Sequence, residues 1–106
     1  MTDARANAID ELEQVRSAYR ALFALQTLHH TPEYRANSEV LYSYLIKIGV
    51  GGARQDMQAD LRFLEEGGLV RFKYVDHHFV VELTASGEDV ALGRCVVDGV
   101  SPPSGT

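Results

Sequence analysis

Hydrophobic residues recur every three or four positions in three stretches of the chain, and this spacing predicts three amphipathic helices. The first is expected from Asp3 to about His30, where Thr31-Pro32 ends it because proline disfavours helical geometry in the residue before it. Its apolar positions are Ile9, Leu12, Val15, Tyr19, Leu22 and Phe23. This helix is longer than a small domain needs, so its first turns are either a solvated helix start or a dimerisation helix.

The second and third helices are separated by a glycine-rich turn. Asn37 or Ser38 can cap the second helix, which is expected to end at the glycines of positions 49–52. The third helix is expected from about Ala53 to Glu66, with three apolar side chains on its core-facing side. These are Met57, Leu61 and Leu64. Gly67-Gly68 then closes the helix.

After these glycines the hydrophobic period changes to two, which is typical of β-strands. Residues 70–74 and 79–83 form two alternating runs joined by Asp76-His77-His78, so a hairpin is predicted. Thr84-Ala85-Ser86 offers a cap for a short helix through about Leu92. We therefore expect one folded domain over residues 1–95 and an extended, Gly/Pro/Ser-rich tail over residues 96–106.

The predicted order is that of an α/β, mostly α, winged helix-turn-helix: a three-helix core, a two-stranded β-hairpin wing and a short C-terminal helix. Residues 61–70 read LRFLEEGGLV, which resembles the L-x-x-L-E-x-x-G-L-V passage from recognition helix to wing in bacterial winged-helix regulators. Leu83-Thr84 followed by Gly87 resembles the L-T-x-x-G that leaves the wing in the same proteins.

Further motifs resemble those of small ArsR-like winged-helix proteins of Mu-like bacteriophages and prophages. They lie at Ser38-Glu39-Val40-Leu41, at residues 58–70, at Gly87-Glu88-Asp89-Val90 with Gly93, and at Gly99-Val100 with Pro102. The likeness covers about residues 15 to 103. It implies a winged-helix fold and a DNA-binding transcription regulator of phage or prophage origin.

Composition and charge restrict the alternatives. A chain of 106 residues with 45% hydrophobic and 24% charged residues fits one globular domain and is too apolar for disorder. Cys95 is the one cysteine, so neither an internal disulfide framework nor a thiolate zinc cluster can form. The sequence shows no membrane-spanning run and no secretory signal pattern, and we expect a cytoplasmic protein without membrane partners.

The third helix and the hairpin carry the residue types that read and hold DNA. Arginine and glutamine hydrogen-bond guanine and adenine edges in the major groove, and cations of the wing meet phosphate. The predicted contacts with double-stranded DNA are Arg54, Gln55, Gln58, Arg62, Arg71 and Lys73. The net charge of −5 and the acidic residues at positions 56, 60, 65 and 66 oppose this interpretation. They favour the alternative, a winged-helix module for protein–protein interaction that does not bind DNA.

Other kinds of site find little support in the sequence. The histidines form two adjacent pairs, His29-His30 and His77-His78, and adjacent side chains point in different directions and seldom chelate one metal. The glycines at 49–52 follow no strand and precede no Gly-Lys-Ser/Thr, so a phosphate loop is not predicted. No nucleophile motif or carboxylate pair indicates an enzyme. We expect no cofactor or metal site, the sequence identifies no small-molecule ligand, and a homodimer through the first helix is the expected assembly.

Overall fold

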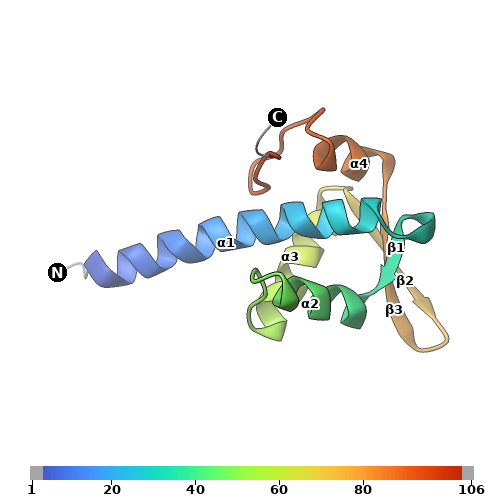
Figure 1. Ribbon diagram of the computed structural model, residues 1–106, viewed down its shortest axis with the longest axis horizontal. Coiled ribbons are helices and arrows are strands. Elements are labelled where there is room, and N and C mark those ends of the chain that lie inside the picture. Colours follow the sequence, from blue (N-terminus) through green and yellow to red (C-terminus); the bar gives the residue numbers. More distant parts are fainter. Residues whose placement is uncertain (1–3, 104–106) are drawn as a thin grey trace.

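The computed structural model describes residues 4–103, and their side chains from residue 8 onward. The elements in chain order are α1 (Ala4–His29), a 3₁₀ turn (Pro32–Tyr34), β1 (Arg35–Asn37), α2 (Ser38–Lys47), α3 (Arg54–Glu66), β2 (Val70–Val75), β3 (His78–Leu83) and α4 (Ala85–Ala91). The predicted α/β winged helix-turn-helix is confirmed, with the β2–β3 hairpin as its wing (Figure 1). Asp3 and residues 104–106, the ends of the expected first helix and tail, lie outside the described residues.

Leucines hold the three-helix core together. Leu25 and Leu28 of α1 pack in one buried cluster with side chains of α2 and α3, among them Leu41, Leu45 and Leu64. Each of these side chains is almost fully buried. Burying a leucine contributes roughly 1.5–3 kcal/mol, so this cluster is the main reason that α3 is held at a fixed place against α1. None of the helices in residues 4–103 is long and apolar enough to cross a membrane.

The sheet has three strands in the order β1-β3-β2, all antiparallel, instead of the expected two. The predicted two-stranded hairpin is confirmed as β2–β3, and the added strand β1 was not predicted because it spans only three residues, too few for an alternating pattern to be visible in the sequence. Its pairing with β3 is a tertiary interaction. Asn37 ends β1 and also caps α2, since its side-chain oxygen accepts a hydrogen bond from the Glu39 N–H at 2.8 Å.

The two faces of the wing differ in chemistry. Val70, Phe72 and Tyr74 alternate with Arg71 and Lys73, so the two sets of side chains lie on opposite faces of the sheet. On the first face Val70 is buried in the core, together with Val81 and Leu83 of β3. The cationic side chains of the wing, on the opposite face, therefore point away from the core. The wing turns at residues 76 and 77, whose φ angles of 48° and 68° are those of a type I′ turn.

The C-terminal segment after α4 has no regular structure as far as residue 103, and it folds back along α1 and α3. Val100 is buried, and the Ser101 N–H donates to the carbonyl oxygen of Ala18 at 3.1 Å. The backbone at Gly99 has φ +89° and passes so close to the Phe63 ring that a Cβ there would lie 2.7 Å from it. These contacts cover part of the outer side of α3.

Candidate nucleic-acid interface

The polar side chains of α3 are sorted onto two sides of the helix. Arg54, Gln58 and Arg62 line a hollow on the side that faces the wing and α2. Asp56 and Asp60 line a different hollow, on the side that faces α1. The acidic residues that counted against DNA binding in the sequence are thus partly separated in space from the arginines and the glutamine.

Asp60 is further neutralised by a buried partner. The Arg20 side chain is 2% exposed and its Nε atom donates to Asp60 Oδ2. Arg20 also donates from Nη1 to the carbonyl oxygen of Val50 at 3.1 Å, and Ser17 Oγ donates to Asp60 Oδ1 at 2.6 Å. A Cβ at Gly52 would lie 2.9 Å from Arg20 Nη1, so the glycine turn leaves room for this guanidinium. Gly51 also has a packing role, because a Cβ there would lie 2.7 Å from the Cα of Ile46.

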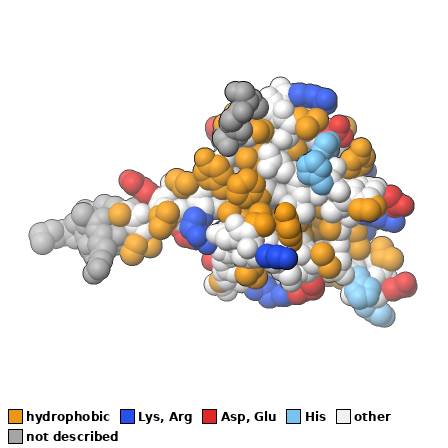
Figure 2. All heavy atoms as spheres, in the orientation of Figure 1, with side chains coloured by type: hydrophobic (Ala, Val, Ile, Leu, Met, Phe, Trp, Pro, Cys, Tyr) orange, Lys and Arg blue, Asp and Glu red, His pale blue; other side chains and the backbone are white. Residues whose placement is uncertain are grey.

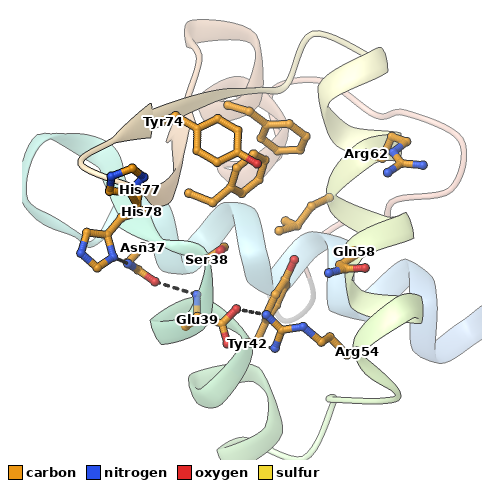
Figure 3. Close-up of a pocket in the computed structure, with 13 residues that line it drawn as sticks. Asn37, Ser38, Glu39, Tyr42, Arg54, Gln58, Arg62, Tyr74, His77 and His78 are labelled. Atoms are coloured by element: carbon orange, nitrogen blue, oxygen red, sulfur yellow. Dashed lines mark hydrogen bonds and ion pairs between the residues drawn. The ribbon is translucent and has the colours of Figure 1, made fainter.

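The hollow beside α3, called the cleft, has a volume of about 490 Å³. The start of α2, one side of α3 and the wing form its walls, as Figure 3 shows. Its lining residues are Asn37, Ser38, Glu39, Tyr42, Arg54, Gln58, Leu61, Arg62, Phe72, Tyr74, His77, His78 and Phe79. In the wing, the Phe79 ring lies 4.8 Å from that of Phe72 and 5.1 Å from that of Tyr74, measured between centroids. The cleft therefore combines cationic and amide groups on α3 with an aromatic wall on the wing.

Arg54 is held at the mouth of the cleft by α2. Both of its terminal nitrogens donate to the two carboxylate oxygens of Glu39, and its guanidinium lies 5.4 Å from the centre of the Tyr42 ring. The Arg54 hydrogen bond holds the pKa of Glu39 below its ordinary value, and Glu39 in turn raises the pKa of Arg54. Burial raises the pKa of the Tyr42 hydroxyl. Arg54 is thus a positioned cation whose charge is already partly compensated.

Arg62 is in a different electrostatic state. Among the described residues it forms no ion pair, and its side chain is exposed. Gln58 projects into the cleft one turn earlier on the same helix (Figure 3). Gln55 is exposed on α3 but is not among the lining residues of the cleft. Arg62 is therefore the α3 cation that is free to meet an external anion or base edge.

The two predicted wing contacts lie away from these residues. Arg71 and Lys73 are on the sheet face opposite the one that carries Phe72 and Tyr74, which line the cleft. Lys73 Nζ lies 3.1 Å from Glu82 Oε1, and this carboxylate also faces Arg35 at 3.7 Å. The structure thus gathers Arg54, Gln58 and Arg62 in one place and leaves the wing cations on a separate face.

Several residues of the cleft were not among the predicted contacts. Glu39 was placed only at the start of the second helix and Tyr42 was not singled out, because contacts with Arg54, which is 15 residues from Glu39, leave no local pattern. The aromatic wall had a visible signal, since three of its rings occur within eight residues of the hairpin. Tyr74 is 78% exposed, so its ring is not part of the core behind the wing.

A comparison with curated proteins supplies one relationship. Over 68 residues the chain is 35% identical to gp26, an uncharacterized protein of Escherichia phage Mu, and the match covers 64% of this chain and 71% of gp26. The chain belongs to the gp26 family. No protein-family model and no solved structure matches it. Membership in the gp26 family agrees with the phage resemblance of the sequence motifs, whereas the resemblance to ArsR-like regulators stays a prediction.

Proposed function

We propose that this gp26-family protein binds double-stranded DNA as a transcription regulator of phage or prophage origin. The third helix, α3, would enter the major groove, and the wing would lie against the sugar-phosphate backbone. The observation that carries the proposal is the sorting of α3: Arg54, Gln58 and Arg62 share the open side, while Asp60 is turned inward onto Arg20. The local charge that a duplex would meet is thus more positive than the total of −5 indicates.

The roles of the three side chains differ. Arg62 is unpaired among the described residues and fits bidentate recognition of guanine, while Gln58, one turn earlier, fits adenine. Arg54 is fixed by Glu39 next to the start of α2, where it would approach a phosphate. Arg71 and Lys73 on the outer wing face would contact backbone phosphate on the flank of the site.

The test is a selection from a random duplex library, followed by fluorescence anisotropy with the enriched sequence at fixed salt. Arg62→Ala is expected to weaken specific binding by about 1–3 kcal/mol, which is roughly 5- to 150-fold in Kd. Arg94→Ala is the matched control, because Arg94 is also an exposed arginine but lies after α4, away from the cleft. The Arg94→Ala variant is expected to bind the selected duplex with the affinity of the wild type.

Two outcomes would contradict the proposal. If the Arg62 and Arg94 variants bound the duplex with equal affinity, α3 would not be the element that recognises the base sequence. Failure of any duplex to bind at low salt would favour the alternative, a winged helix used for protein–protein interaction. Tyr74 and the exposed part of Phe63 would then be the side chains to replace first in a search for that surface.

A further inference from the structure

The outer side of α1 carries an apolar stripe, defined here as Ile9, Leu12, Val15 and Tyr19. These four side chains are 59%, 59%, 52% and 38% exposed. The helix projects beyond the domain over its first turns (Figure 1), and Figure 2 shows hydrophobic side chains along the projecting part and where it meets the body. Removing this apolar surface from water would favour packing of the stripe against a partner.

The stripe leads directly into a groove on the body of the protein. Phe23 continues it, with its ring 5.9 Å from that of Tyr19 between centroids. The groove has a volume of about 670 Å³ and runs along α1 between α2 and α4. It is lined by Phe23, Gln26, Thr27, His29, His30, Thr31, Tyr44, Ile48, Ala91 and Leu92. One continuous apolar surface thus extends from the free half of α1 to a groove beside its second half.

The two halves of this surface match in length, and among the described residues no carboxylate lines the groove to repel those of the free half. At 1.5 Å per residue, the span from Ile9 to Tyr19 is about 15 Å and that from Tyr19 to His30 is about 16 Å. The free half carries exposed carboxylates at Asp10, Glu11 and Glu13. The groove is lined by no carboxylate of the described residues, and two histidines lie at its far end.

We propose that a second copy of this chain occupies the groove, so that two α1 helices pack antiparallel about a two-fold axis near Tyr19. The free half of each helix then lies in the groove of the other copy, which is the isologous contact that a closed two-fold dimer requires. An antiparallel crossing at Tyr19 places Val15 of one copy beside Phe23 of the other, and Leu12 beside Gln26. This assembly does not depend on DNA binding.

The oligomeric state of the full chain tests the proposal, measured by light scattering after size-exclusion chromatography at tens of micromolar. The wild-type protein is expected at twice the mass of one chain. Leu12→Glu on the stripe and Leu92→Glu on the groove wall are each expected to give monomers. Gln14→Glu is the matched control, because it adds the same carboxylate to the free half outside the stripe, and it is expected to stay dimeric.

Disulfide trapping distinguishes the antiparallel arrangement from a parallel pairing of the free halves. In a Cys95→Ser background, Leu12→Cys protein mixed with Gln26→Cys protein is expected to form the mixed disulfide under mild oxidation. A parallel pair would instead cross-link Leu12→Cys to itself. A monomeric wild-type protein, a Leu92→Glu variant that remains dimeric, or cross-links between two Leu12→Cys chains would each overturn the proposal.

Discussion

Removing one partner of the buried Arg20–Asp60 ion pair should destabilise the protein far more than removing one partner of an exposed pair. Asp60→Ala removes the carboxylate that accepts from the Arg20 side chain and from the Ser17 hydroxyl. Among the described residues Arg20 then keeps only its hydrogen bond to the Val50 carbonyl oxygen, in a site where it is 2% exposed. A guanidinium left buried without its carboxylate is the costly result of this change.

The expected size follows from the burial of the two partners. Removing one partner of a buried pair costs about 3–5 kcal/mol. The Asp60 side chain is 13% exposed, so water can partly replace it, and we expect a loss near the lower limit, about 3 kcal/mol. With roughly 4–8 °C per kcal/mol for a domain of this size class, Tm should fall by about 12 °C or more.

Urea unfolding followed by circular dichroism measures this loss directly. Asp89→Ala is the control, because Asp89 faces Arg94 at 3.4 Å with an exposed side chain and should lose about 1 kcal/mol or less. Arg20→Met added to Asp60→Ala should recover part of the stability, since it removes the unpaired charge. An Asp60→Ala loss no larger than that of Asp89→Ala would refute the reasoning.

Three further predictions concern a packed glycine, the pH dependence of stability and the salt dependence of DNA binding. Gly87→Ala places a Cβ against the carbonyl oxygen of Leu69, just before β2, and should lower the free energy of unfolding by about 1–3 kcal/mol or prevent folding. In the same urea titration the control Gly67→Ala should be close to neutral, because its Cβ would meet only ordinary van der Waals contacts. The hydrogen bond from Arg54 lowers the pKa of Glu39, so the pair stabilises the fold above pH 4.5. This stabilisation is lost as the pH falls through the lowered pKa and Glu39 becomes protonated. The stability difference between wild type and Glu39→Gln should therefore shrink below pH 4.5, and a constant difference would contradict the pairing. If DNA binds as proposed, Arg71→Ala should reduce the slope of log K against log salt by about one unit without changing sequence preference, as anisotropy at several salt concentrations would show.

Much of the fold was readable in the sequence because it is encoded locally. The stripe of Met57, Leu61 and Leu64 placed the buried side of α3 correctly, since helical spacing alone decides which residues share a face. Thr84 caps α4 as predicted, by accepting a hydrogen bond from the Gly87 N–H at 3.0 Å. Each of these features depends on residues within a few positions of one another.

What the sequence did not reveal depends on contacts between distant residues. Arg20 lies in an otherwise apolar stretch of α1, and its partner Asp60 is 40 positions away, so Asp60 was counted as a surface charge opposed to DNA. The Glu39–Arg54 pair crosses from one helix to the next in the same way. For the candidate site, the residue types on α3 were therefore predictable, but their distribution between free and compensated charges was not.

The strand β1 pairs with the wing and runs directly into α2, with no loop between them. Asn37 pairs with Val80 in the sheet, lies 3.4 Å from a ring nitrogen of His78 at the base of the turn, and also caps α2. No slack chain separates the two elements, so a displacement of the wing is transmitted to the first turn of α2 and, through Glu39, to Arg54. The positions of the wing and of Arg54 at the start of α3 are therefore linked through β1, α2 and Glu39.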